Sequence, residues 1–291
     1  MTSELHRHFS VGPELGRGRF GTVRRCTSLL SGEHFAVKSV DKARLLDDPL
    51  DRASLENEPK LTRLAAAGNP SAVQIHAVFE DPLHLHLVLD LLPGPDLLQR
   101  ITASAPFPEP EAAAVLAALA DALAACHRRG VCHRDVKPDN VLFDEQGRLR
   151  LADFGSAEFF GDGGRMEGVV GTPYYVAPEV VAGREYDEKV DVWSAGVVLY
   201  AMLSGTVPFY GDSAAEVFDK VLRGNLRFPS ALFREVSPAA KDLLRRMLCR
   251  DASRRLSAEQ VLSKYSFLGE FYFSGRHQNL TIFYLPPPIH R

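Results

Sequence analysis

The chain has 291 residues, of which 45% are hydrophobic and 24% charged, and its net charge is −3 at pH 7. This composition is ordinary for a globular protein with a hydrophobic core, and the charge gives no reason to expect nucleic-acid binding. The four cysteines form no CxxC pair, which excludes an obvious disulfide framework or zinc site. Residues 1–10 contain no apolar secretion signal, so we expect a reduced, cytoplasmic location.

Short β-type runs dominate roughly the first ninety residues. Strands are expected at 9–14, 22–28, 34–40, 73–79 and 84–91, and a charged stretch with helical spacing at 47–64. The sequence Pro93-Gly94-Pro95 is the strongest break in the chain and is interpreted as a hinge.

Helical periodicity dominates after the hinge. Apolar faces predict helices at 111–128, 189–204, 214–223, 238–248 and 257–262. The alanine-rich stretch 112–126 is the most apolar of the chain, but it is too short to cross a bilayer, so we expect a buried helix. The chain is therefore expected to be α+β, with a small β-rich lobe at 9–92, a larger helical lobe at 93–265, and a ligand cleft between them.

A GxGxxGxV string begins at Gly16 and continues through Gly18, Gly21 and Val23. Because a strand rather than a helix is expected after it, the string belongs to a hairpin and not to a dinucleotide-binding turn. Glycines in such a loop let backbone N–H groups approach phosphates closely. Alone the string is a weak signal, since Gly-rich turns have many structural uses.

Lys38 ends an apolar strand, where a lysine is costly unless it meets an anion. Candidate anions are the phosphates of ATP and a carboxylate of the following helix. We expect Glu58 to be that carboxylate, with Glu56 as the alternative. The competing interpretation is that Lys38 is an ordinary surface lysine without a role in binding. Pro59 follows Glu58 and removes a helical hydrogen bond, so the helix should be short, bent there, or begin late.

Two strings in the middle of the chain, HRDVKPDN and DFG, place many charges between apolar residues. Buried charges need partners or a metal. Asn140 and Asp153 offer oxygen donors suited to Mg²⁺. Asp135 would accept the proton of an attacking hydroxyl, and Lys137 would offset the charge of a transferred phosphoryl group. The joint pattern indicates phosphoryl transfer from MgATP.

These strings make the chain resemble a eukaryotic protein kinase over about residues 9–262. Further matching strings are GTPYYVAPE from Gly171, DVWSAG from Asp191, and the segment 251–255. The resemblance implies a bilobal protein-kinase fold that uses ATP and Mg²⁺. It also implies that Lys137 together with Thr172 forms the serine/threonine version of the catalytic loop rather than the tyrosine version.

The resemblance assigns roles to further residues. It implies that Asp191 anchors the catalytic loop and that Glu179 pairs with Arg255 to hold the substrate-binding segment. Besides the three glycines and Lys38, the residues implied to surround ATP are Leu15, Val23, Ala36, Leu89, Asp90, Leu92, Asp96 and Leu142.

Longer strings, among them NEPKL and CRDASRRLSAEQVL, resemble the plant branch of the calcium/calmodulin-dependent kinase group, and within it the phosphoenolpyruvate carboxylase kinase family. That family is a bare catalytic domain, and this chain likewise lacks a DxDxDG calcium loop. The resemblance implies calcium-independent phosphorylation of an N-terminal serine of phosphoenolpyruvate carboxylase, whose basic neighbours would meet Asp96 and Asp139. We expect a monomer with no nucleic-acid or membrane partner.

Two alternatives stay open. A calcium-dependent-type kinase acting on other proteins is one, because a missing calcium loop does not identify the substrate. An inactive isoform or pseudokinase scaffold is the other, although the catalytic set is complete.

Between Gly155 and Gly171 the only hydroxyl residue is Ser156, so the usual activating phosphorylation position has none. We therefore expect activity without an activating phosphate, with Glu167 supplying a fixed negative charge near Arg134. A merely solvated Glu167 is equally compatible with the charge pattern.

Three further features stand apart from the catalytic strings. His84 and His86 lie on one face of an expected strand, but no third ligand is apparent, so metal binding is disfavoured. Residues 1–8 are expected to form an N-terminal arm. The chain reads Ser-Lys-Tyr at 263–265, where relatives close with His-Pro-Trp, so the tail 266–291 is interpreted as translated intron or an alternative isoform.

Overall fold

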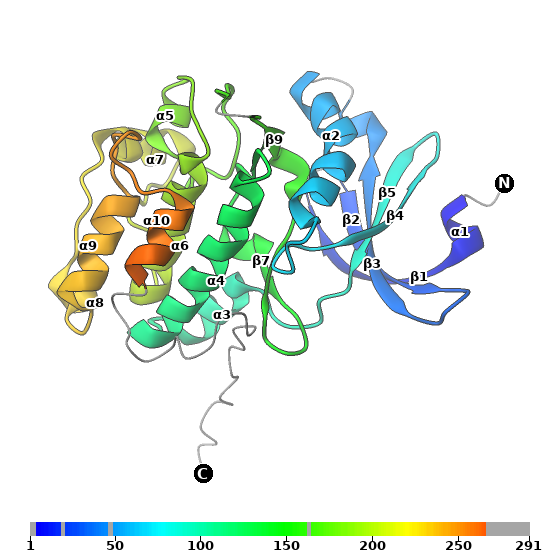
Figure 1. Ribbon diagram of the computed structural model, residues 1–291, viewed down its shortest axis with the longest axis horizontal. Helices are drawn as coiled ribbons and strands as arrows, with labels where there is room; N and C mark the ends of the chain where they lie inside the picture. The colour runs from blue at the N-terminus through cyan, green and yellow to red at the C-terminus, as the bar shows by residue number, and fades with distance from the viewer. Residues whose placement is uncertain (1–3, 19–20, 46–48, 162–163, 266–291) are drawn as a thin grey trace, which may run out of the picture.

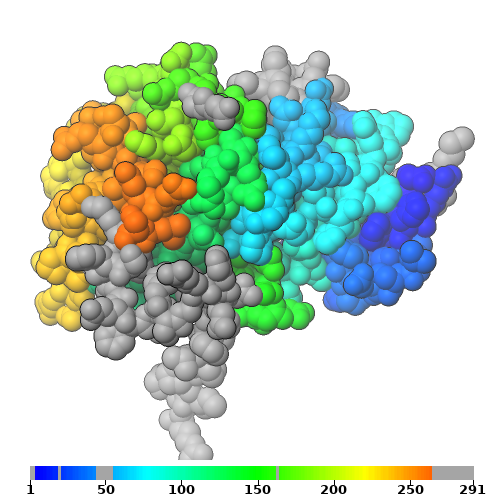
Figure 2. Space-filling view, in the orientation of Figure 1, coloured from blue at the N-terminus to red at the C-terminus, as the bar shows by residue number. Residues whose placement is uncertain are grey.

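The computed structural model describes residues 4–18, 21–45, 49–161 and 164–265, which form two lobes (Figure 1). A β-sheet and one long helix build the N-lobe, and helices dominate the C-lobe. In the space-filling view the blue-to-cyan N-lobe lies beside the green-to-orange C-lobe (Figure 2). The α+β, bilobal architecture expected from the sequence is confirmed.

The N-lobe sheet has five strands, paired antiparallel in the order β1-β2-β3-β5-β4. The strands are β1 (Phe9–Arg17), β2 (Gly21–Ser28), β3 (His34–Asp41), β4 (Ile75–Glu80) and β5 (His84–Asp90). Each overlaps a run that the sequence predicted as a strand. β1 is longer than expected and includes the first glycine of the Gly-rich string.

One face of this sheet packs against helix α2 (Pro49–Ala66). Leu85 and Leu87 of β5 form a buried cluster with Val40, and Leu55 of α2 packs on it. Since side chains alternate along a strand, the residues between these leucines face away from α2. We call the α2 side the inner face of the sheet and the other side the outer face.

The outer face is covered in part by α1 (Glu4–His8), a helix that the sequence analysis did not predict. Its Leu5 is 1% exposed and packs with Cys26, Val37 and Val88. Part of the expected N-terminal arm therefore belongs to the N-lobe core.

Helix α2 is neither short nor late, because it spans 18 residues with Pro59 inside it. The missing proline N–H leaves the carbonyl four residues earlier without its helical partner. Pro59 is itself buried, as are Glu58 and Leu61 beside it. Burial against the rest of the protein thus keeps the helix intact across a residue that disfavours it locally.

The C-lobe is built on two buried central helices, α4 and α6. Its helices are α3 (Leu97–Ser104), α4 (Glu109–His127), α5 (Pro178–Val181), α6 (Lys189–Ser204), α7 (Ala214–Arg223), α8 (Ser230–Phe233), α9 (Pro238–Met247) and α10 (Ala258–Tyr265). The sequence predicted α6 and α7 residue for residue, predicted α4, α9 and α10 with shifted ends, and missed α3, α5 and α8.

Short strands and 3-10 turns complete the fold. They are β6 (Val131–Cys132), β7 (Val141–Phe143), β8 (Leu149–Leu151), β9 (Glu158–Phe159), and the 3-10 turns η1 (Lys42–Leu45), η2 (Pro138–Asn140) and η3 (Phe154–Ser156). β6 pairs with β9, and β7 pairs with β8. These pairings set the catalytic strings side by side.

Helix α4 is long and apolar enough to cross a membrane by length and composition, the one such helix among the described residues. Most of it is buried in the C-lobe, where Val115, Leu119 and Leu123 join the main hydrophobic core. This agrees with the buried helix expected from the sequence.

The expected hinge lies between β5 and α3, in a segment without helix or strand. Gly94 approaches the neighbouring chain closely there, because a Cβ atom on it would lie 3.1 Å from the backbone oxygen of Phe143. The tail 266–291, which we interpret as atypical, lies outside the described residues.

Candidate active site

The catalytic loop rests on Asp191, in the first turn of α6. Asp191 is fully buried and accepts hydrogen bonds from the backbone N–H groups of His133, at 2.9 Å, and Arg134, at 2.8 Å. His127 Nε2 lies 2.8 Å from the same carboxylate. Burial alone would raise the pKa of Asp191, but these hydrogen bonds and the histidines lower it. The loop is thus fastened to the C-lobe core by one ionised side chain.

Asp135 stands at the centre of the loop, where three predicted site residues meet. Lys137 Nζ donates to Asp135 Oδ2 at 2.7 Å, and Thr172 Oγ1 donates to Asp135 Oδ1 at 2.8 Å. Lys137 Nζ also donates to Thr172 Oγ1 at 3.1 Å. Asn140 Nδ2 donates to the backbone oxygen of Asp135 at 2.9 Å. Residues up to 35 positions apart in the sequence therefore surround one carboxylate that could accept a proton.

A second cluster joins the two lobes through Lys38. Its Nζ donates to Glu58 Oε1 and to Asp153 Oδ1, each at 2.6 Å. The inner-face lysine of β3 thus meets one carboxylate from α2 and one from the C-lobe. Glu58 is buried and Glu56 is exposed, so the structure brings the first alternative, and not the second, to Lys38.

Lys38 stabilises the charges of both carboxylates, although the two carboxylates repel each other. Burial alone would lower the pKa of Lys38, but the nearby Glu58 and Asp153 carboxylates raise it instead. The charge of Lys38 is the main cause that lowers the pKa of Asp153 to about 2. Burial raises the pKa of Glu58, and Lys38 opposes that rise. Lys38 is therefore a protonated lysine held between two carboxyl side chains.

The DFG string has a constrained geometry at this point. Asp153 has a left-handed backbone, with φ at 62°, which a residue with a side chain adopts only under constraint. A Cβ on Gly155 would lie 3.2 Å from Asp153 Oδ1 and 3.4 Å from Glu58 Oε2. A side chain at this position would crowd the two carboxylates. His133 also supports the string, since its ring lies 4.9 Å from that of Phe154.

The inner face of the sheet carries the apolar residues expected around ATP. In the strand register Val23 lies opposite Lys38, and Ala36 lies opposite Leu89, so their side chains share the face that carries Lys38. Ala36 is buried, and Leu15 of β1 is 52% exposed. The remaining expected residues, Leu92 and Leu142, are partly buried.

The glycines of the loop differ in their surroundings. A Cβ on Gly21 would lie 2.0 Å from the backbone oxygen of Ser39, so only glycine fits there. Gly16 and Gly18 have no atom within 4 Å of such a Cβ. The backbone at these two positions therefore borders open space, as a loop that folds over phosphates requires.

Two acidic residues of the hinge region use their side chains for structure. The Asp90 carboxylate accepts from Gln74 N at 3.0 Å and lies 2.8 Å from His76 Nε2, and the Asp90 backbone N–H donates to Gln74 O at 3.2 Å. Asp96 caps α3 by accepting from Gln99 N at 2.7 Å. A ribose contact by Asp96 would have to share a carboxylate that already has this partner.

Glu179 and Arg255 form a buried, bidentate ion pair. Arg255 Nη1 lies 2.5 Å from Glu179 Oε1, and Arg255 Nη2 lies 2.9 Å from Glu179 Oε2. Arg255 also donates to the backbone oxygens of Cys249 and Lys189 and lies over the ring of Trp193. Helix α5, which contains Glu179, is thereby fixed to the C-terminal part of the C-lobe.

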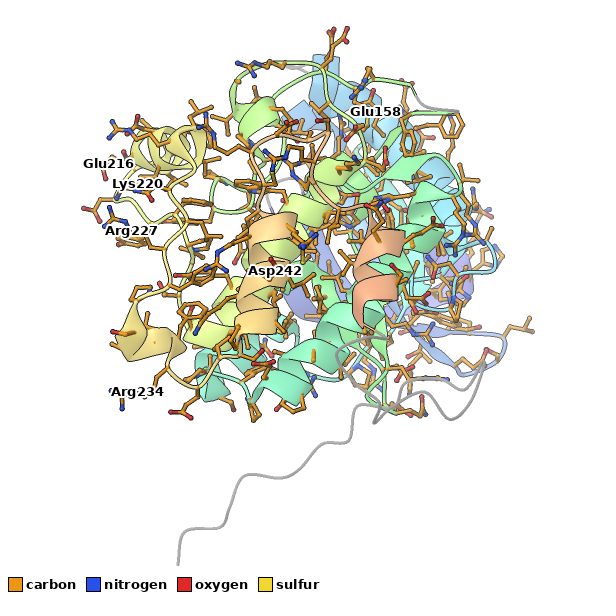
Figure 3. All side chains as sticks on the ribbon, turned by 60° about the vertical axis from the view of Figure 1, so that its left-hand side comes forward. Glu158, Glu216, Lys220, Arg227, Arg234 and Asp242 are labelled. Atoms are coloured by element: carbon orange, nitrogen blue, oxygen red, sulfur yellow. The ribbon has the colours of Figure 1, made fainter. Side chains whose placement is uncertain are left out.

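Sequence analysis missed the carboxylate that pairs with Arg134. The guanidinium forms an ion pair with Glu158 of β9, labelled in Figure 3, and donates to Tyr186 OH at 3.1 Å. Glu167, the expected partner, has an exposed side chain and reaches this group only through its backbone oxygen, which accepts from Tyr186 OH at 3.1 Å. No local pattern marks Glu158, because its approach depends on the pairing of β6 with β9.

The side chains of this site fit a nucleoside triphosphate with bound Mg²⁺. Asp153 and Asn140 supply oxygen atoms of the kind that Mg²⁺ prefers, and Asp153 remains 46% exposed despite its bond to Lys38. Lys38 and Lys137 carry positive charge toward the same region, where phosphate oxygens would need it. The arrangement can position a phosphoryl donor and deprotonate a hydroxyl.

Comparison with known proteins gives one consistent result. The protein kinase domain family matches residues 9–267. Calcium-dependent protein kinase 24 of Oryza sativa subsp. japonica is 40% identical over 264 residues, which cover 90% of this chain and 51% of that protein. Calcium-dependent protein kinase 21 of Arabidopsis thaliana is 38% identical over 262 residues, or 89% and 49%. The chain spans about half the length of the curated relatives it matches.

Proposed function

This chain belongs to the protein kinase family, and we propose that it transfers the γ-phosphoryl group of MgATP to a serine or threonine of a protein. The observation that carries the proposal is a pair of charged clusters on two loops that are bonded to each other, since Ala152 N donates to Asn140 O at 2.9 Å. Lys38, Glu58 and Asp153 form one, and Asp135 with Lys137 forms the other.

Each cluster has a distinct task in this reaction. Lys38, kept in place by Glu58, binds phosphate oxygens of the nucleotide. Asp135 orients the attacking hydroxyl and accepts its proton, while Lys137 offsets the negative charge that the moving phosphoryl group carries. Asn140 and Asp153 would hold Mg²⁺, which neutralises phosphate charge when bound. Catalysis then consists mainly of positioning and charge stabilisation.

The proposed substrate is an N-terminal serine of phosphoenolpyruvate carboxylase, and the proposed reaction is independent of calcium. Support comes from the strings that resemble the phosphoenolpyruvate carboxylase kinase family, which is a family of bare catalytic domains. Asp139 is exposed beside the catalytic loop, where it suits a basic residue of a substrate. We further propose that the protein acts in the cytoplasm as a monomer.

We also propose that activity needs no activating phosphate. In kinases that need one, the phosphate neutralises an arginine and orders the activation segment. Here Glu158 already supplies a carboxylate to Arg134, and Tyr186 links that arginine to the backbone of residues 167 and 168. A built-in charge can therefore take the place of the modification.

The test is phosphate transfer from MgATP to purified phosphoenolpyruvate carboxylase, with protein made in bacteria and with calcium either added or chelated. Labelling of one N-terminal serine at equal rates in both conditions is expected, and Asp153→Ala should abolish it. Labelling of a generic basic peptide but not of phosphoenolpyruvate carboxylase would refute the substrate and keep the kinase. No transfer to either by folded, ATP-binding protein would refute the kinase activity itself.

A further inference from the structure

Three potential metal ligands meet on the outer face of the N-lobe sheet, at the turn between β4 and β5. Asp81 lies in the turn, and His84 and His86 follow it on β5. Because Leu85 and Leu87 face α2, the two histidines face the opposite side. This group is separate from the catalytic clusters, because Lys38 lies on the inner face of the sheet and Asp135 lies in the C-lobe.

The ligand atoms are close enough to share one ion. All three lie within 4.8 Å of one another. Asp81 Oδ2 is 3.1 Å from His86 Nε2, and Asp81 Oδ1 is 3.8 Å from His84 Nδ1. A tetrahedral Zn²⁺ with bonds of about 2.0–2.2 Å holds neighbouring ligand atoms about 3.3 Å apart. Small side-chain rotations therefore bring the group to the required geometry.

The turn and the sheet hold two of these ligands in place. Asp81 Oδ1 accepts from the backbone N–H groups of Leu83, at 2.9 Å, and His84, at 2.8 Å. His86 is 7% exposed, and its Nδ1 lies 2.8 Å from Ser39 Oγ on the adjacent strand. A contact of this kind at one ring nitrogen fixes the orientation of a metal-binding histidine and leaves the other nitrogen for the ion.

The charges around the group do not oppose a cation. Asp81 is a carboxylic acid, a class of side chain that is ordinarily ionised at neutral pH, so it brings a negative charge to the group. Lys42 donates to the backbone oxygen of Asp81, but it is also paired with Glu80 at 2.6 Å. The Glu80 carboxylate therefore offsets the charge of Lys42, so that this lysine repels a bound ion less.

We propose that Asp81, His84 and His86 form a Zn²⁺ site, with water completing the coordination. Two imidazoles and one carboxylate favour zinc over Mg²⁺ or Ca²⁺, which prefer oxygen ligands alone. The bound ion would tie the β4–β5 turn to β5 and, through Ser39, to β3. The site does not depend on the proposed kinase reaction, since it lies outside the catalytic cleft.

The proposal is tested by calorimetric titration of Zn²⁺ into the full chain after chelator treatment, at pH 7.5 with excess Mg²⁺ present to occupy oxygen-only sites. One equivalent should bind, and His84→Gln should weaken binding at least tenfold. His84 is partly exposed, so this change does not threaten the fold as a change at buried His86 would.

A matched control is His76→Gln. His76 also pairs with a carboxylate on the sheet, because its Nε2 lies 2.8 Å from Asp90 Oδ1. Among the described residues, however, no third His, Cys, Asp or Glu side chain lies close enough to complete a metal site with that pair. This variant should bind Zn²⁺ like the unchanged protein. Failure of the unchanged protein to bind, unaltered binding by His84→Gln, or an equal loss in His76→Gln would each overturn the proposal.

Discussion

Replacing Glu158 by glutamine tests whether a built-in carboxylate stands in for an activating phosphate. The change keeps the size of the side chain and its hydrogen-bonding oxygen but removes the charge. The guanidinium of Arg134 would then keep its bonds to Ser156 O, at 2.7 Å, and to Tyr186 OH without an opposite charge. The link between the catalytic loop and β9 should weaken, and activity should fall.

The size of the effect follows from the exposure of the pair. A hydrogen bond to a charged group contributes about 1.5–3 kcal/mol when it is shielded from water. The Arg134 side chain is 10% exposed and that of Glu158 is 41% exposed, so water screens the pair in part. We therefore take about 1–2 kcal/mol as the contribution of this ion pair to the stability of the active conformation. Losing it corresponds to a loss of about five- to thirtyfold in kcat/KM.

The assay is steady-state phosphorylation of a serine peptide by Glu158→Gln and, as the matched control, Glu167→Gln. Glu167 is exposed in the same segment and contributes only its backbone to the Arg134 group, so its change should alter kcat/KM less than twofold. Thermal unfolding of both variants separates lost activity from lost folding. Full activity of Glu158→Gln, or an equal loss in Glu167→Gln, would refute the reasoning.

The remaining predictions concern the other ion pairs. Glu58→Gln should lower kcat at least tenfold, because Lys38 loses its buried partner, whereas Glu56→Gln should change it less than twofold in the same peptide assay. Arg255→Met leaves Glu179 buried without its partner and should destabilise the fold by about 3–5 kcal/mol, measured by urea unfolding. The pKa of Asp153 is depressed to about 2 in the folded protein. The stability that the ionised side chain contributes is therefore complete above about pH 4 and is lost as the pH falls toward 2. The difference in unfolding free energy between the unchanged protein and Asp153→Asn should shrink over that range.

The helices that the sequence predicted residue for residue carry their own boundary signals. Ser213 caps α7 by accepting from Glu216 N, and Gly224 ends it in a left-handed conformation. Gly205 ends α6 in the same way. Helix α1 has only five residues, too few for a periodic apolar face to appear, and it is held mainly by the burial of Leu5. Local signals therefore identify long capped helices and miss short ones fixed by packing.

The active site shows the same contrast between what local sequence patterns predict and what depends on packing. Motif strings predict which residues meet nucleotide and substrate, because family resemblance ties each string to a role. They cannot show that Arg134 and Asp153 both adopt left-handed backbones, a conformation that costs about 1–3 kcal/mol for a residue with a side chain. That strain is offset by distant groups: Asp191 binds the N–H of Arg134, and Lys38 binds the carboxylate of Asp153. Because the offsetting charges come from α6 and β3, the geometry of the site is a property of the assembled fold, and removing either charge should relax the strained backbone before it unfolds the protein.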